Sequence, residues 1–189
     1  MSDPREALAR IRALLAAAPE DTAYTPRPVL TEPELLAWEA AHGLTLPDEY
    51  RLFLREIGDG GTMPGAYCDF VLDPLAEVRG GRSAATPFPV TTDRLRERLR
   101  RLKSEGHPAD GVLFPELVPY WEDDQPPGCL VFGQYPSSDA LFLVACGDLR
   151  GSVWCAVCRG IPETDPSGEP FGFLAWFADA LSDLRREVP

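Results

Sequence analysis

The sequence lacks most of the features that mark membrane and secreted proteins. It has no apolar run near the roughly 20 residues needed to cross a bilayer. Its first residues mix acids and arginines, whereas a signal peptide has a basic end followed by an apolar stretch. It contains five cysteines, an odd number that does not suit a disulfide framework. These absences predict a cytoplasmic protein with reduced thiols.

Lysine is nearly absent, and bases of either kind are too few to balance the acids. Lys103 accompanies seventeen arginines, and the net charge is -12. Residues 31–78 carry ten acids and two bases, residues 79–108 three acids and eight bases, and residues 109–189 thirteen acids and four bases. Such a surface repels nucleic acid and anionic lipid and attracts basic partners. We therefore expect a basic protein partner, no nucleic acid and no membrane.

Side chains that suit familiar catalytic mechanisms are also scarce. His42 precedes a glycine at a predicted helix end and His107 lies in a predicted loop, so neither is placed as a general base. No G-x-S-x-G motif occurs. Acids are plentiful, however, so composition alone leaves a two-acid hydrolase open. The prediction is a protein with no catalytic residues, and a carboxylate enzyme is the less favoured alternative.

Two of the cysteines, Cys155 and Cys158, form a C-x-x-C motif that could indicate a redox pair or half of a zinc site. They lie in a predicted strand, where residues three apart face opposite sides of the sheet. The other cysteines provide no second short-spaced pair for a metal. We expect buried structural thiols, no metal and no cofactor, with a thiol enzyme or metal site as the alternative.

Hydrophobic periodicity predicts an α+β fold with a mainly antiparallel sheet flanked by helices. The length of 189 residues suits a single domain. Apolar residues at helical spacing predict helices over 4–17, 32–42, 47–57, 93–105 and 171–188. Short apolar runs bounded by turn residues predict strands over 66–74, 129–133, 140–146 and 152–158. The order of helices, strands and a final helix is typical of α+β domains.

Residues 44–61, "LTLPDEYRLFLREIGDGG", combine a helix start with a glycine-rich turn. Pro47 suits the first turn of a helix, and Asp48 with Glu49 complements the positive end of its dipole. We expect Gly58 to end this helix in the left-handed conformation. A phosphate-binding loop precedes its helix, whereas these glycines follow one, so the pattern predicts a structural turn.

The same stretch carries a resemblance to a known family. The ordered residues are Leu35, Glu39, Gly43, Leu46, Pro47, Tyr50, Phe53, Leu54, Gly58, Asp59, Gly60 and Gly61. This arrangement resembles the N-terminal signature of the SUKH superfamily of Smi/Knr-like domains. The later strands and the closing helix are similar to that family more loosely, and the likeness covers residues 30–184. We therefore divide the chain into an N-terminal helix and connector (1–29) and a SUKH-like domain (30–189), with the basic helix 93–105 as an elaboration.

The resemblance implies a noncatalytic binding fold. In bacteria, SUKH domains are frequently immunity proteins that neutralise a cognate toxin, often a nuclease, and in fungi related domains regulate cell-wall synthesis. An acidic protein suits a basic toxin, because negative charge steers and blocks such a partner. A regulatory or scaffold module unrelated to toxins is the alternative function.

Acidic and aromatic residues provide the candidate contacts to a partner. The segment 120–127, "YWEDDQPP", places three acids between aromatic residues and prolines, a composition that suits recognition. The predicted partner-binding residues are Asp59, Tyr120, Trp121, Glu122, Asp123, Asp124, Tyr135 and Asp139. A solvated acidic loop is the simpler interpretation of the same segment. The basic helix 93–105 is best explained by a solvated face, with an anionic surface as its alternative partner.

Overall fold

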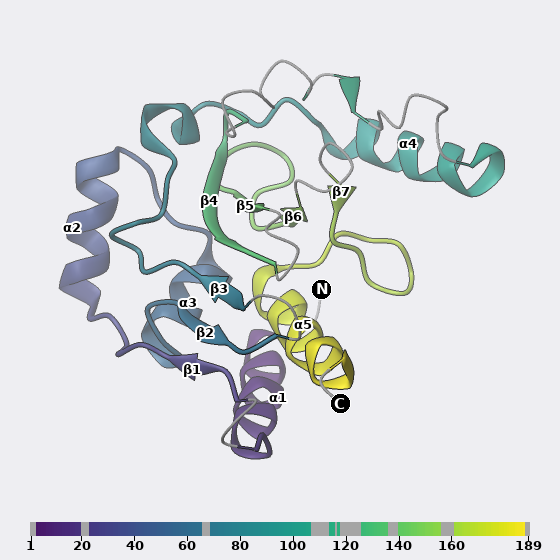
Figure 1. The fold of residues 1–189 in the computed structure, drawn as a ribbon. Helices are drawn as coiled ribbons and strands as arrows, with labels where there is room; N and C mark the ends of the chain where they lie inside the picture. Colours follow the sequence, from purple (N-terminus) through teal and green to yellow (C-terminus); the bar gives the residue numbers. More distant parts are fainter. Residues whose placement is uncertain are drawn as a thin grey trace.

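A computed structural model describes residues 3–19, 23–65, 69–106, 114–115, 117, 126–135, 140–155 and 161–187 (Figure 1). The helices are α1 (Pro4–Ala16), α2 (Glu32–His42), α3 (Asp48–Glu56), α4 (Thr92–Glu105) and α5 (Phe173–Glu187), with a 3-10 turn η1 (Gly81–Ala85). The strands are β1 (Thr25–Pro26), β2 (Gly61–Met63), β3 (Phe70–Leu72), β4 (Cys129–Gln134), β5 (Ala140–Val144), β6 (Val153–Cys155) and β7 (Ile161–Pro162).

The strands form one antiparallel sheet in which each strand pairs with its neighbours in chain order, from β1 to β7. This order needs no crossover connection, because antiparallel neighbours can follow one another directly along the chain. The predicted α+β class with a mainly antiparallel sheet is therefore confirmed.

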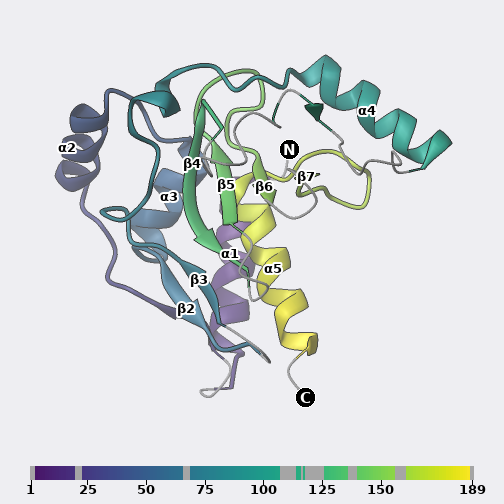
Figure 2. The ribbon, with the colours of Figure 1, turned by 45° about the horizontal axis from the view of Figure 1, so that its top comes forward.

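Both faces of the sheet are covered. Helices α1, α3 and α5 pack on one face, and Figure 2 shows α1 and α5 running side by side behind the central strands. The buried side chains of these helices and of the sheet face beneath them form a first hydrophobic cluster. A second hydrophobic cluster, which includes Leu95 of α4, covers the other face. Successive residues of β4, β5 and β6 alternate between the two clusters, as the period of a strand requires. Val153 and Trp154 follow this alternation, whereas Cys158 lies outside the described residues.

The ends of α2 follow the sequence prediction. The Glu34 carboxylate accepts a hydrogen bond from the Thr31 amide (2.8 Å) and the Thr31 side chain accepts one from the Glu34 amide, which forms the expected capping box. The Thr31 hydroxyl also donates to the Glu34 carboxylate (2.6 Å). Gly43 ends the helix in the left-handed conformation, with φ of 65°. Residues within about a dozen positions of one another therefore determine both ends of α2.

The expectation for Gly58 was wrong. Helix α3 ends at Glu56 with Ile57 as its C-cap, and the left-handed conformation belongs to Gly60, with φ of 70°. Gly58 is required for a different reason, because a Cβ there would lie 2.6 Å from the carbonyl oxygen of Arg27. The chain approaches this glycine from a segment about 30 residues earlier, which no local pattern reveals.

The two terminal helices belong to the same core. Ala7, Leu8 and Ile11 of α1 are buried in the cluster that contains α5. Arg12 forms an ion pair of 2.6 Å with Glu56 of α3. The N-terminal helix therefore contributes to the packing of the domain that follows it.

Helix α4 confirms the predicted basic helix and lies at the edge of the molecule (Figure 1). Leu95 is buried, and Leu99 and Leu102 are partly buried against the second cluster. The other side of the helix is exposed, and Arg101 forms an ion pair there with Glu97 (2.7 Å). Within the described residues, no helix combines the length and the apolar character that crossing a bilayer requires.

Candidate functional site

Only two of the predicted partner-binding residues fall within the described part of the chain. The Asp59 carboxylate is partly buried and accepts a hydrogen bond from the Leu75 amide (2.6 Å). The partly buried Tyr135 hydroxyl accepts one from the Trp176 indole (3.1 Å). Burial raises the pKa of both groups. The remaining predicted residues, Tyr120, Trp121, Glu122, Asp123, Asp124 and Asp139, lie outside the described residues.

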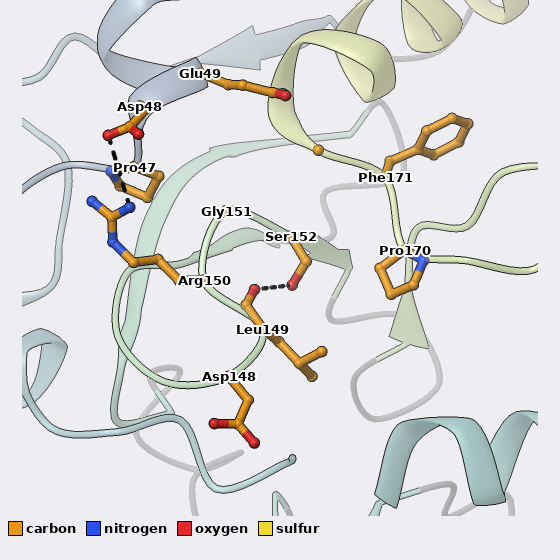
Figure 3. Close-up of a pocket in the computed structure, with 11 residues that line it drawn as sticks. Pro47, Asp48, Glu49, Asp148, Leu149, Arg150, Gly151, Ser152, Pro170 and Phe171 are labelled. Atoms are coloured by element: carbon orange, nitrogen blue, oxygen red, sulfur yellow. Dashed lines mark hydrogen bonds and ion pairs between the residues drawn. The ribbon is translucent and has the colours of Figure 1, made fainter. Parts of the chain in front are cut away.

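The structure also contains a pocket that sequence reasoning did not identify (Figure 3). Its volume is about 290 Å³, and three segments that are distant in the sequence form its walls. These segments are the start of α3 (47–49), the turn between β5 and β6 (148–152) and the residues before α5 (170–172). We call this cavity the α3–α5 pocket.

The first wall depends on a buried glutamate behind it. Glu39 of α2 is 8% exposed, and its carboxylate accepts hydrogen bonds from the Leu46 amide (2.8 Å) and the Arg51 guanidinium (3.0 Å). A buried charge is stable only when it is paired and hydrogen-bonded, and both conditions hold here. Glu39 thus holds the loop that leads into α3, which explains its place in the N-terminal signature.

The second wall is tied to the first by Arg150 in the β5–β6 turn. Its guanidinium donates hydrogen bonds to the carbonyl oxygens of Leu46 (2.7 Å) and Thr45 (3.3 Å). It also lies 3.9 Å from the Asp48 carboxylate. Figure 3 marks this ion pair with a dashed line. A guanidinium has five donors in a rigid fork, so one side chain can join two loops in this way.

The third wall is held by Glu49. Its Oε2 atom accepts a hydrogen bond of 3.0 Å from the amide of Leu174 in the first turn of α5. The carboxylate thereby satisfies a free amide at the positive end of that helix. The contact needs a glycine at position 172, because a Cβ there would lie 2.6 Å from Oε2 of Glu49.

The lining combines apolar surface with an excess of negative charge. Pro47, Leu149 and Pro170 contribute apolar groups. Three carboxylates, from Asp48, Glu49 and Asp148, face one guanidinium, that of Arg150. Among the described residues, those that line the pocket include no histidine, cysteine or lysine. The hydroxyl of Ser152 donates to the Leu149 carbonyl oxygen (2.7 Å) and accepts from the Trp154 indole (2.9 Å), so the lining offers recognition groups more readily than a nucleophile.

Sequence reasoning missed the pocket for identifiable reasons. The pattern around Asp48 and Glu49 indicates only the dipole of their own helix, and residues 147–151 show only the composition of a turn. One signal is available, since Arg150 is one of only four bases among residues 109–189. An isolated arginine in an acidic region needs acceptors, but the sequence does not say which loop supplies them.

The described thiols are buried or partly buried. Cys129 and Cys155 are buried and Cys146 is partly buried, while Cys68 and Cys158 lie outside the described residues. Burial raises the pKa of the Cys129 thiol, which disfavours the thiolate. Across the described ranges, no three His, Cys, Asp or Glu side chains gather in a way that could hold a metal ion.

Comparison with known proteins identifies one family. The family model described as SMI1 / KNR4 family (SUKH-1) matches residues 30–184. This range contains all three walls of the α3–α5 pocket and the buried Glu39, whereas α1 precedes it. No curated protein and no solved structure matches the chain.

Proposed function

This chain belongs to the SMI1 / KNR4 family (SUKH-1), and we propose that it is a noncatalytic, cytoplasmic protein-binding domain that acts as an immunity protein. In this proposal it neutralises a cognate toxin with a basic surface, such as a nuclease, by covering that surface. The family match over residues 30–184 is the observation that carries the proposal.

The charge of the protein supports the same partner class. The net charge is -12, and residues 31–78 and 109–189 carry most of the excess acids. Acidic surfaces accelerate encounter with basic proteins and are screened by salt. Binding to the toxin should therefore weaken as the ionic strength rises.

The proposed contact surface includes the acidic and aromatic segment 120–124, together with Asp59, Tyr135 and Asp139. Charged and aromatic side chains in one segment suit a recognition surface, because aromatic anchors supply area and acids supply complementarity. Asp59 and Tyr135 also hold internal hydrogen bonds, so they would contact the partner from fixed positions.

Co-expression with the product of the adjacent gene tests the function directly. We expect the two proteins to copurify and this chain to rescue cells from the toxicity of that product. Copurification with an unrelated cell protein and no rescue would favour a regulatory module instead. Turnover of a substrate that one point substitution abolishes would refute the noncatalytic assignment.

Charge reversal tests the surface. The triple variant Glu122→Lys, Asp123→Lys and Asp124→Lys should bind the partner more weakly and with less dependence on salt. The matched control, Glu6→Lys with Asp93→Lys and Glu105→Lys, changes the same charge at three exposed acids of α1 and α4. Unchanged affinity and salt dependence in the first variant would show that segment 120–124 is not part of the surface.

A further inference from the structure

We propose that the α3–α5 pocket receives one cationic side chain of the protein partner, an arginine in preference to a lysine. This inference rests on the proposed function, because it names the group of the partner that this pocket binds. The size, lining and charge of the cavity each favour such a side chain.

The size of the pocket suits a single side chain. Its volume of about 290 Å³ lies at the lower limit of ligand pockets, which span roughly 300–1,000 Å³. Its walls are joined by the hydrogen bonds of Arg150 to the loop before α3 and of Glu49 to α5. The cavity is therefore formed before a partner arrives, which lowers the ordering cost of binding.

The apolar lining suits a long aliphatic stem. Pro47 and Leu149 are buried in the wall, and Pro170 is partly buried beside them. Arginine and lysine cover apolar surface with their methylene groups while the charged end stays near polar groups. A short polar side chain or a free inorganic ion would leave this surface without contacts.

The charge of the lining selects a cation. Figure 3 shows the carboxylates of Asp48 and Asp148 at separate edges of the pocket. The Asp48 side chain is 95% exposed, and Asp148 is also exposed. Oε1 of Glu49 accepts no hydrogen bond from any residue in the described ranges. The Arg150 guanidinium already donates to two carbonyl oxygens. The lining therefore holds more carboxylate acceptors than this one cation satisfies.

Arginine fits these acceptors better than lysine. Its planar fork donates two parallel hydrogen bonds to a carboxylate, whereas an ammonium acts as a point charge. Arginine is also enriched among the residues that dominate protein interfaces. An anionic ligand is disfavoured, because three carboxylates face one guanidinium in the lining.

The experiment titrates the full chain with N-acetyl-arginine methylamide and follows backbone amides by NMR. The neutral control is the citrulline analogue, which has nearly the same shape, and inorganic phosphate is the anionic control. Chloride is held constant throughout. We expect arginine amide to shift the amides of residues 147–152 and 172–174, and citrulline amide and phosphate to leave them unchanged.

Two variants separate pocket binding from general attraction to an acidic protein. Asp48→Asn with Asp148→Asn should raise the Kd for arginine amide about threefold to tenfold, the range expected for two exposed ion pairs. Asp69→Asn with Glu105→Gln removes the same charge from exposed positions that do not line the pocket. This second variant should leave the Kd within about twofold, because distant exposed charges are screened.

Each outcome decides the proposal without the toxin. Absence of pocket shifts at about 50 mM arginine amide, equal shifts with citrulline amide, shifts with phosphate, or equal weakening in both variants would each refute it. Rescue from toxicity tests the immunity function separately. Pocket shifts without rescue would retain the cation site and reject the toxin as partner. Rescue without pocket shifts would retain the toxin as partner and reject the cation site.

Discussion

Glu49 and Leu174 are 125 residues apart in the chain, yet Oε2 of Glu49 accepts a 3.0 Å hydrogen bond from the Leu174 amide. The glutamate belongs to the first turn of α3, but it caps the first turn of α5. One side chain thus joins the two helices and shapes the α3–α5 pocket between them. A glycine at position 172 permits the approach.

Replacement of Glu49 tests this cap. We expect Glu49→Ala to lower the free energy of unfolding by about 1–2 kcal/mol, because the Leu174 amide loses its acceptor and α5 its dipole partner. Urea unfolding followed by circular dichroism measures the change. The adjacent Asp48→Ala is the control and should cost below about 1 kcal/mol, since that side chain is 95% exposed. Equal losses in both variants would contradict the cap.

Glu39 supports a second prediction on stability. Glu39→Ala should lower the free energy of unfolding by about 2–4 kcal/mol, because it leaves the buried Leu46 amide without an acceptor and Arg51 without its buried partner. Glu32, which is 46% exposed and also pairs with Arg51, provides the control. Glu32→Ala should cost at most about 1 kcal/mol. A larger loss for Glu32→Ala than for Glu39→Ala would reverse the assignment.

Three glycines separate backbone strain from lack of space. Gly43 has φ of 65° and open space where a Cβ would stand, so Gly43→Ala should cost about 1–2 kcal/mol through strain alone. Gly58 has no positive φ, so Gly58→Ala should cost about 1–3 kcal/mol through close contacts with the Arg27 carbonyl oxygen (2.6 Å) and the Pro26 Cβ (2.8 Å). Gly60→Ala combines φ of 70° with a Cβ that would collide with the Leu72 carbonyl oxygen, and should cost about 3 kcal/mol or more.

Thermal and urea unfolding of the three alanine variants provide the ranking. The structure predicts the largest loss for Gly60→Ala. Equal losses for Gly43→Ala and Gly60→Ala would mean that the turn after α3 relaxes away from β3, and that the close approach contributes nothing to stability.

Glu163 predicts a dependence of stability on pH. Desolvation by burial, with repulsion from Asp179, raises the pKa of Glu163 above its ordinary value of 4.5. A raised pKa means that the folded protein holds the Glu163 proton more tightly than the unfolded chain does. The stability that comes from this proton is fully present below the unfolded pKa and is lost as the pH rises through the folded pKa. Glu163→Gln removes this titration, so the variant should gain stability relative to the parent as the pH rises from acid to neutral.

Asp165 provides a comparison of opposite sign. The hydrogen bond from the Ser167 hydroxyl (2.5 Å) lowers the pKa of Asp165, so its contribution is lost as the pH falls through the folded pKa. Asp165→Asn should therefore lose stability relative to the parent at neutral pH and approach it in acid. Unfolding curves at a series of pH values measure both differences, and the same sign for both variants would contradict the two assignments.

Much of the fold follows from local sequence. The capping box of Thr31 and Glu34, the glycine after α2 and the leucine spacing of α4 each depend on residues within one or two helical turns. The alternation of β4 to β6 likewise follows from the period of a strand. These elements agree with their predictions for that reason, whereas the apolar pattern does not predict the short strands β1, β2 and β7.

The sequence by itself determined the helices, the central strands, the acidic balance and the family resemblance, because each depends on neighbouring residues or on composition. Only the tertiary structure decided that Glu49 caps α5, that Arg150 joins two loops and that Gly58 makes room for Arg27. These roles depend on distances between segments far apart in the chain. Hydrogen bonds and steric contacts act over a few ångströms of space, and sequence separation does not report that distance.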